Sequence, residues 1–324
     1  MKVLLIGLGR WGEKHLRVLR ELGCEVWVAD VSDERRAFAV KSGVPEAHAV
    51  TDFRSALPHV DAVDLVTPAD NHLALASECL QDGKDCFVEK PLTLTVAEGR
   101  ALAQAVRATR RVLQVGHIFR FHPVTTFMRE RIRSGSVGPV RYCTGRFAGF
   151  KRPRTDVGVT QTDGIHYFDL FAYLLGREPT AVTATLRDFL GRGMDDLGFC
   201  AVEYGETPAF VEAGYFAPGT YRDCVIVGEQ ETLAGDFGTA EVKVLANRHV
   251  KQGNAWNAPE GVAETHKATG PEPLSHELKL FLDACANRTE PAVDVEAGLL
   301  ALRVVEAAQQ SSKLGRRVQL SEMI

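Results

Sequence analysis

The sequence predicts an α/β domain built on a doubly wound parallel sheet, followed by an α+β domain with a largely antiparallel open sheet. The chain has 324 residues, enough for two hydrophobic cores at roughly 100–200 residues per domain. Up to about residue 120, short apolar runs alternate with amphipathic helical patterns, and beyond that point strand-like runs follow one another. We therefore expect one domain over residues 1–120 and a second over residues 121–324.

The N-terminal half alternates between strand and helix. The run "KVLLIG" leads to a helix expected over about residues 11–22, and "EVWVAD" leads to one over about residues 33–42. The runs "DAVDLVTP", "DCFVEKP" and "VLQVG" continue the pattern. Continuous apolar strands are typical of a parallel sheet covered by helices on both sides. Right-handed crossovers between them produce a doubly wound sheet.

The C-terminal half has strand-like runs rich in Val, Thr, Tyr and Phe, joined by Gly, Pro and Asp turns. Such runs are typical of antiparallel strands. Two amphipathic helices are expected to close the chain, over about residues 274–287 and 294–313. Residues 254–273 are expected to form a long loop.

The composition excludes several classes of function. The chain is 45% hydrophobic and 25% charged, with a formal net charge of −4, which gives no electrostatic footprint for nucleic acid or an anionic membrane surface. No apolar run reaches the roughly 20 residues that span a bilayer. The seven cysteines are scattered and form no CxxC pair. We therefore expect neither a disulfide framework nor a metal site, and a reducing, cytoplasmic setting.

A glycine motif marks a cofactor site. The stretch "GLGRWG" has the GxGxxG pattern, follows the first strand and opens a helix, and Asp30 ends the second strand about 20 residues later. The first glycine permits a tight turn, the second lets the backbone approach a pyrophosphate, and the third allows close helix packing. Backbone N–H groups at the helix start then hold the phosphates. We expect dinucleotide contacts from Gly7, Gly9, Arg10, Trp11 and Gly12.

Asp30 indicates which dinucleotide binds. Its carboxylate is suited to accept hydrogen bonds from the ribose hydroxyls, whereas a 2′-phosphate would meet a like charge, so the sequence favours NAD over NADP. Ser32, Arg35 and Arg36 follow closely and could contact a 2′-phosphate if the loop turned back. A solvated helix face is the alternative for both arginines.

The strand ending in "FVEKPL" brings Glu89 and Lys90 to the edge of the sheet where ligands of such folds bind. The following proline confines the backbone of Lys90 to extended geometries. Beside an oxidised nicotinamide, desolvation and like charge would both lower the pKa of Lys90 from about 10.4 toward 7–8, a change of roughly 3–4 kcal/mol. The lysine could then take a proton from a substrate hydroxyl as hydride leaves. A surface salt bridge with Glu89 is the alternative.

A second candidate site for proton transfer lies in "TQTDGIHYFDL", where Asp163 and Asp169 bracket His166 at three-residue spacing. His166 and Asp169 would share a helix face and could form a base with its orienting carboxylate. The alternatives are a core histidine, and an N-cap role for Asp163.

Upstream of this stretch, "GFKRPRTDVGVT" carries three basic side chains. They could bind a substrate carboxylate or diphosphate, because arginine suits bidentate recognition of oxyanions, or they could form a solvated basic loop. These side chains are Lys151, Arg152 and Arg154.

Several segments together resemble one family. In chain order they are "GLGRWG", "VTPADNH", "DCFVEKPL", "GHIFRFHP" and "DGIHYFDL". They resemble the glucose–fructose oxidoreductase / inositol dehydrogenase / rhizopine catabolism (Gfo/Idh/MocA) family over essentially the whole chain. The resemblance implies a Rossmann domain, a C-terminal open sheet used for homodimer or homotetramer assembly, and NAD(P)-dependent oxidation or reduction of sugars, polyols or their derivatives.

The resemblance also implies residue roles. Lys90 is the catalytic lysine and also a cofactor contact, and Glu89 is a nicotinamide-side contact. The remaining dinucleotide contacts are Thr67, Pro68, Asn71 and His72, with Arg120 at the domain junction.

Many relatives read Asp-x-Gly-x-His-x-x-Asp around the histidine. Here Thr162 stands where the first aspartate belongs, and Asp163 comes one position late, a rotation of about 100° on a helix. The division of proton handling between Lys90 and His166 therefore stays open. The expected substrate contacts are Lys90, Arg152, Thr162, Asp163, His166 and Asp169.

Three functions remain in competition. The first is hydride transfer to or from a sugar or polyol, either free or nucleotide-linked. The second is a regulator that binds the dinucleotide without chemistry. The third is reduction of a non-sugar carbonyl or imine, because a fold alone does not fix a reaction.

Overall fold

The computed structural model describes residues 1–259 and 261–323. The chain forms two compact units: the first comprises Met1–Ile118 and Glu272–Leu302, and the second comprises Phe119–Pro271 and the chain from Arg303 onward. Residues 272–302 thus pack with the first unit, whereas the sequence indicated a single change of domain near residue 120. Within the described residues, no helix combines the length and apolarity that crossing a bilayer requires.

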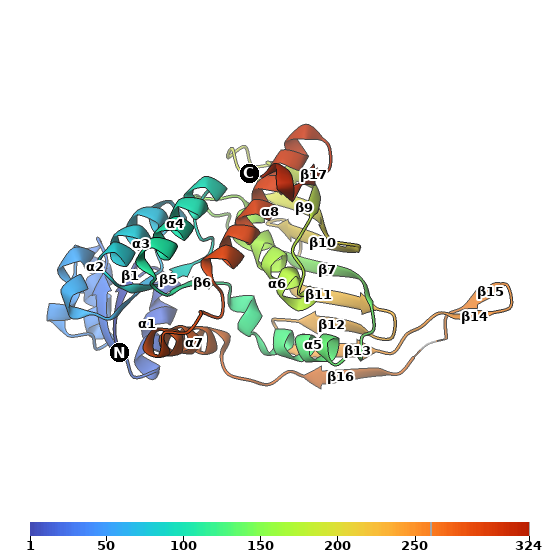
Figure 1. Cartoon of the computed structure of the whole chain (residues 1–324), viewed down its shortest axis with the longest axis horizontal. Coiled ribbons are helices and arrows are strands. Elements are labelled where there is room, and N and C mark those ends of the chain that lie inside the picture. The colour runs from blue at the N-terminus through green and yellow to red at the C-terminus, as the bar shows by residue number, and fades with distance from the viewer. Residues whose placement is uncertain (260, 324) are drawn as a thin grey trace. The chain divides into compact units, whose positions relative to one another are not determined.

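A six-stranded sheet forms the centre of the first unit, in the order β3-β2-β1-β4-β5-β6 (Figure 1). All of its pairings are parallel, which confirms the predicted doubly wound sheet. Every residue of β4 and β5 is buried, as expected for strands covered on both faces. The strands are β1 (Lys2–Ile6), β2 (Glu25–Ala29), β3 (Ala49–Val50), β4 (Ala62–Leu65), β5 (Asp85–Glu89) and β6 (Leu113–Gly116).

The helices of this unit begin where their sequence signals lie. The helix after β5 starts with a capping box between Thr95 and Glu98, and the first helix begins at the last glycine of the motif. Phe281, from the returning C-terminal segment, packs edge-on against Phe87 of β5 with ring centroids 5.7 Å apart. The helices are α1 (Gly12–Glu21), α2 (Asp33–Lys41), α3 (His72–Gln81), α4 (Val96–Thr109) and α7 (Pro273–Asn287), followed by α8 (Val295–Leu314), which continues into the second unit.

The second unit contains a nine-stranded sheet in the order β16-β13-β12-β11-β7-β10-β9-β8-β17. Its one parallel pair is β7 with β10, and the other pairings are antiparallel, so the largely antiparallel sheet is confirmed. The strands are β7 (Val140–Gly149), β8 (Ala181–Arg187), β9 (Leu197–Tyr204), β10 (Thr207–Gly214), β11 (Thr220–Gly228), β12 (Thr232–Asp236), β13 (Glu241–Leu245), β16 (Ala263–Lys267) and β17 (Val318–Gln319).

Two helices, α5 (Pro123–Arg133) and α6 (Ile165–Leu175), complete this unit, and a π-helical turn over Thr160–Gly164 leads directly into α6. Short 3-10 turns cover Glu46–His48, Phe53–Ser55, Leu57–His59, Ala69–Asn71, Ile118–Phe121 and Leu320–Glu322.

Helix α6 is fixed to the sheet by Tyr167. Its hydroxyl lies 2.9 Å from the Arg146 carbonyl oxygen of β7 and 2.7 Å from the Asp223 carbonyl oxygen of β11. The ring occupies the space over Gly145, where a Cβ atom would overlap it. The glycine therefore sets how closely the helix that carries His166 can approach the sheet.

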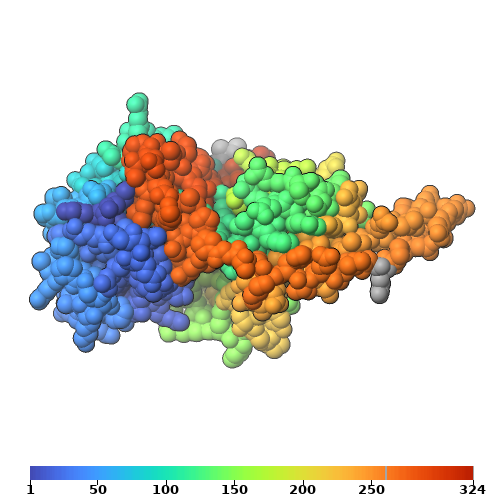
Figure 2. Space-filling model, turned by 90° about the horizontal axis from the view of Figure 1, so that it is seen from below, coloured from blue at the N-terminus to red at the C-terminus, as the bar shows by residue number. Residues whose placement is uncertain are grey.

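The prediction of a long loop over residues 254–273 is wrong, although residue 260 lies outside the described residues. Strand β16 lies there and pairs with all of β13 at the edge of the sheet. Strands β14 (Val250–Gln252) and β15 (Ala255–Asn257) pair with each other, and their hairpin projects beyond the sheet (Figures 1 and 2). No strand is predicted for these residues from the sequence, because they are nearly all exposed and lack apolar alternation.

We predict that Gly145→Ala lowers the free energy of unfolding by about 1–3 kcal/mol, because the added methyl group overlaps the Tyr167 ring. Urea unfolding monitored by circular dichroism measures the change. The control is Thr144→Ala, whose side chain points to the other face of β7, and we expect a smaller loss. Equal losses in the two variants would contradict the role assigned to Gly145.

Candidate functional site

The three glycines of the motif meet three different constraints. Gly7 has φ +93°, and a Cβ on it would lie 2.7 Å from the Val66 carbonyl oxygen. A Cβ on Gly12 would overlap the carbonyl oxygen of Gly7, so the third glycine allows the helix to approach the strand. Around Gly9, no atom in the described part of the chain lies within 4 Å of the Cβ position. A dinucleotide phosphate can therefore approach the backbone at Gly9, beside the start of α1.

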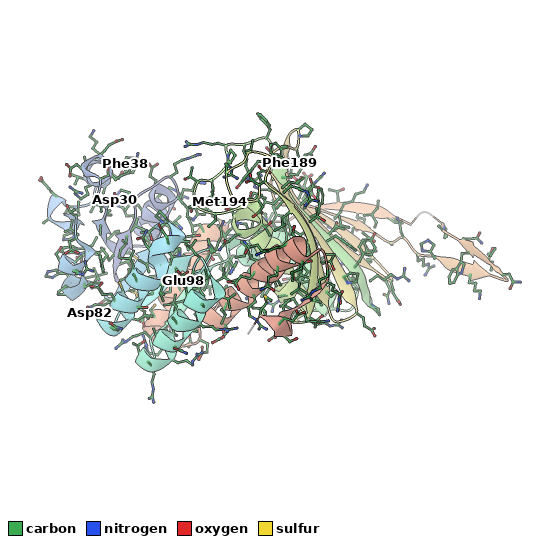
Figure 3. The ribbon with its side chains drawn as sticks, turned by 90° about the horizontal axis from the view of Figure 1, so that it is seen from above. Asp30, Phe38, Asp82, Glu98, Phe189 and Met194 are labelled. Carbon is green, nitrogen blue, oxygen red and sulfur yellow. The ribbon has the colours of Figure 1, made fainter. Side chains whose placement is uncertain are left out.

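The carboxylate of Asp30 is held at the end of β2 by two backbone amides (labelled in Figure 3). Leu8 N donates to Oδ2 at 2.7 Å and Ser32 N donates to Oδ1 at 2.9 Å. The first of these bonds joins the carboxylate to the glycine turn. Each oxygen retains a lone pair for a ribose hydroxyl, so the residues present fit NAD.

The two arginines that could have served NADP already have carboxylate partners. Arg35 Nη1 lies 2.5 Å from Glu13 Oε1, and Arg36 pairs with Asp33 and donates to the Asp30 carbonyl oxygen at 2.6 Å. Their charges are therefore compensated within the unit. Ser32 caps α2 through a 3.4 Å bond from Arg35 N to its Oγ.

Glu89, at the end of β5, links the glycine motif to Lys90. Its Oε1 accepts a hydrogen bond from Trp11 Nε1 at 2.7 Å, and its Oε2 accepts one from the backbone N–H of Lys90 at 3.0 Å. Trp11, expected as a cofactor contact, thus uses its indole N–H within the protein. Lys90 is half-buried, and its bond to Pro91 is cis.

Two further ionisable residues, His15 and Asp64, were missed by the sequence analysis. His15 Nδ1 lies 2.8 Å from Asp64 Oδ2, and His15 Nε2 lies 3.2 Å from Glu89 Oε1. Both His15 and Asp64 have 0% relative exposure. The available signal was Asp64 itself, a charged residue inside the apolar run "AVDLV", where a strand covered on both faces must give it a partner.

The three groups shift one another's pKa. Burial lowers the pKa of His15, but the charges and hydrogen bonds of Asp64 and Glu89 outweigh it and raise the pKa to about 10. Burial raises the pKa of Asp64 despite the nearby His15. Burial also acts to raise the pKa of Glu89, but His15, Trp11 and Lys90 together bring it below its usual value.

Of the four residues expected to line the dinucleotide around β4 and α3, three lie at the surface and one lies beneath them. Thr67 is half-buried, while Pro68 and Asn71 are exposed. His72 is buried, with Nδ1 3.0 Å from the Pro91 carbonyl oxygen and Nε2 3.0 Å from that of Thr67. It thus connects the loops after β4 and β5. Burial lowers the pKa of His72, although the carbonyl oxygens oppose the shift.

In the second unit, His166 is held by aromatic stacking. Its ring centroid lies 4.6 Å from that of Phe119 and 5.5 Å from that of Phe147, with interplanar angles of 19° and 9°. Asp169, predicted to orient His166, accepts hydrogen bonds from Arg120 at 2.8 Å from Nε and 2.5 Å from Nη2. Arg120, expected among the cofactor contacts, is thereby fixed by a buried carboxylate.

The N-cap prediction for Asp163 is wrong, because helical geometry already begins at Thr160 and Asp163 lies inside the π-helical turn. Its buried carboxylate binds Lys151 Nζ at 2.6 Å. Thr162 is buried as well. Burial, with the charge of Asp163, raises the pKa of Tyr215 to about 12.

Two of the three positive charges of the basic loop (Lys151, Arg152 and Arg154) are compensated by carboxylates. Arg154 binds Asp156 through Nε at 2.8 Å and Nη2 at 2.5 Å, and Lys151 is paired as above, while Arg152 is exposed.

The ends of β7, β8 and β10 lie at one edge of the sheet, since β7 and β10 are parallel and β8 and β10 both pair antiparallel with β9. Exposed phenylalanines gather there: Phe150 is 84% exposed, and Phe189 and Phe216 lie with ring centroids 5.9 Å apart. Figure 3 shows Phe189 and Met194 on the loop between β8 and β9. The sequence analysis missed this aromatic edge (Phe150, Phe189 and Phe216).

Within residues 1–259 and 261–323, no three His, Cys, Asp or Glu side chains are arranged to hold a metal ion.

Comparison with known proteins places these features in a family. Residues 1–117 match the oxidoreductase family with the NAD-binding Rossmann fold, and residues 129–320 match the C-terminal alpha/beta domain of the same family. UDP-N-acetylglucosamine 3-dehydrogenase of Acidithiobacillus ferrooxidans is 34% identical over 185 residues, and this alignment spans only 57% of each chain. scyllo-Inositol 2-dehydrogenase (NAD(+)) of Bacillus subtilis is 28% identical over 94% of this chain and 84% of its own.

The solved structures agree on the fold. Levoglucosan dehydrogenase in complex with NADH and levoglucosan has a TM-score of 0.84 at 20% identity, with 99% of both chains covered. The matches to both family domains cover most of the sequence. The chain therefore belongs to the Gfo/Idh/MocA oxidoreductase family, with its NAD-binding Rossmann domain at the N-terminus and its alpha/beta domain following.

Proposed function

We propose that this protein is an NAD-dependent dehydrogenase or reductase that transfers a hydride between the nicotinamide and a CH–OH or carbonyl carbon of a sugar- or polyol-type substrate. One observation carries the proposal: the glycine turn, the fixed carboxylate of Asp30 and the strand end at Lys90 belong to one rigid sheet. The family relatives support the substrate class, since their names specify inositols and a UDP-linked sugar.

The residues of the chain have separate roles in this reaction. The backbone at Gly9 and the start of α1 hold the pyrophosphate, and Asp30 holds the ribose. The nicotinamide, when bound, supplies or accepts the hydride. Lys90 Nζ exchanges the proton with the substrate oxygen, and His166 assists, with its ring plane fixed by Phe119 and Phe147.

A nucleotide-linked substrate is favoured over a free polyol by the aromatic edge. Exposed aromatic rings offer a stacking surface to a planar base, and a small polyol has no apolar part to place there. Lys151 and Arg154 already have carboxylate partners. The exposed Arg152 is therefore the basic side chain of this loop that is most suited to bind a diphosphate.

Self-association through the nine-stranded sheet is also part of the proposal. Phe210 lies opposite Thr144 and Phe199 opposite Glu212, which places these side chains on one face of the sheet. Phe199 and Phe210 are each about half exposed there. A two-fold pairing of identical faces would cover them on both copies at once.

We predict that NADH binds more tightly than NADPH, because a 2′-phosphate would meet the Asp30 carboxylate. Asp30→Ala should weaken NADH binding by about 10- to 100-fold, the cost of lost hydrogen bonds to a charged group. Fluorescence titration measures both, with Asp52→Ala as a control at an exposed aspartate of the same unit. Equal affinities of the unmodified protein for NADH and NADPH would contradict the role of Asp30 in selecting NADH.

Lys90→Ala should lower kcat by about 10²–10⁴-fold while NADH affinity is retained, because the variant loses the proton-transfer group and keeps the backbone that holds the dinucleotide. His166→Ala should lose less. Lys279→Ala, at an exposed ion pair on α7, is the matched control. Near wild-type turnover by the Lys90 variant would refute the mechanism, and turnover of no substrate by the wild-type protein would favour the regulator.

The substrate class is tested by thermal unfolding of the NADH-saturated protein against free polyols, free sugars and UDP-linked sugars. A ligand at 100 times its Kd adds about 2.7 kcal/mol to the free energy of unfolding. We expect UDP-linked sugars to stabilise most. Stabilisation by a free polyol alone would contradict the assignment of the aromatic edge and the basic loop to a nucleotide-linked substrate.

A further inference from the structure

We propose that His15 and Asp64 are positioning residues that hold Glu89 as an anion and thereby fix the backbone of Lys90 at the end of β5. The inference rests on the proposed function only in taking Lys90 as the reacting lysine. We call Asp64, His15 and Glu89 the buried triad. They come from β4, α1 and β5, so the contacts join three elements of one unit.

The geometry favours the charged form of His15. A carboxylate oxygen faces each ring nitrogen, at 2.8 Å on the Asp64 side and 3.2 Å on the Glu89 side. A neutral imidazole has one N–H, so one of the two carboxylates would face a nitrogen lone pair. An imidazolium offers a donor to both. The triad then contains two negative charges and one positive charge.

The remaining negative charge is directed toward Lys90. On Glu89, Oε1 accepts a hydrogen bond from Trp11 Nε1 and lies 3.2 Å from His15 Nε2, while Oε2 accepts a hydrogen bond from the backbone amide of Lys90. Gly116 of β6 makes room for this arrangement, since a Cβ there would lie 2.9 Å from Glu89 Oε1. The carboxylate is thus confined on several sides, and its orientation determines where the amide of Lys90 is held.

Two aromatic rings and three titratable groups lie near the triad. The rings of Trp11 and Phe87 lie edge-on to the imidazole at centroid distances of 5.9 and 5.7 Å. Cys24 is within electrostatic range of Asp64, and His72 and Lys90 are within range of Glu89.

The first test uses the wild-type protein alone. Selective ¹⁵N labelling of histidine, followed by NMR from about pH 6 to 9, reports the protonation of each imidazole nitrogen. We expect both nitrogens of His15 to stay protonated throughout, because its pKa is raised to about 10. The stability that the charged ring provides is then complete below about pH 6.5 and is lost as the pH rises toward that raised pKa. Loss of a proton near pH 6.5 would overturn the proposal.

The second test uses Asp64→Asn, which keeps the side-chain shape and removes one carboxylate. We expect His15 to titrate at lower pH, and the amide proton of Lys90 to shift and to exchange about tenfold faster. The matched control is Asp85→Asn, a buried aspartate on β5 that binds Val112 N at 2.9 Å and Arg288 at 2.6 Å outside the triad. We expect this control to lose stability without altering either signal. Equal changes in both variants would make the triad merely structural and overturn the inference.

Turnover provides a third and separate readout. With a substrate in hand, Asp64→Asn should lower kcat about tenfold or more while the Kd for NADH stays within about threefold, in line with losses at supporting residues. Unchanged kcat would overturn the positioning role. Because both NMR readouts need no substrate, a wild-type protein that turns nothing over would refute the proposed function while the inference about Glu89 and Lys90 is decided independently.

Discussion

The burial of the Glu89 carboxylate is the constraint on which the first unit depends. An ionised carboxylate away from water is costly unless charged and hydrogen-bonding partners compensate it. Here the partners are Trp11 and His15, on either side of the last motif glycine, and the backbone amide of Lys90. The same carboxylate therefore joins the cofactor turn to the end of the strand that carries the lysine. A displacement of one would displace the other, so the position of a bound dinucleotide and that of Lys90 are coupled.

The sequence predicted those structural elements that have a local or periodic residue pattern. The parallel strands and their helices follow from apolar runs and helical spacing, and the glycine turn follows from a six-residue pattern whose first and third glycines each meet a visible steric demand. It did not predict the return of residues 272–302 or the pairing of His15 with Asp64, which lie 49 positions apart. Such contacts depend on which elements become neighbours in space. Strand β16 was missed because a polar edge strand carries no burial pattern.

In the second unit, the two aspartates that bracket His166 in the sequence each bind a different cation. Asp163 binds Lys151, and Asp169 binds Arg120, so each buried carboxylate has its own cation. A buried charge selects the nearest group that can compensate it fully, and a guanidinium or ammonium does so at any pH near neutrality. His166 stacks on Phe119 and Phe147, which fix the plane of its ring. Spacing along a helix could not have distinguished these outcomes.

Two buried histidines in the first unit show how partner type determines what a residue can do. His15 faces carboxylates, and its pKa rises to about 10; His72 faces backbone carbonyls, and its pKa falls below the usual value. Near pH 7 the first is therefore a fixed cation and the second is mainly neutral, and neither changes charge readily there. Under the proposed reaction, neither can deliver a proton during turnover. His15 joins β4 to the end of β5, and His72 joins the loops that follow these strands. Proton transfer is left to Lys90 and His166.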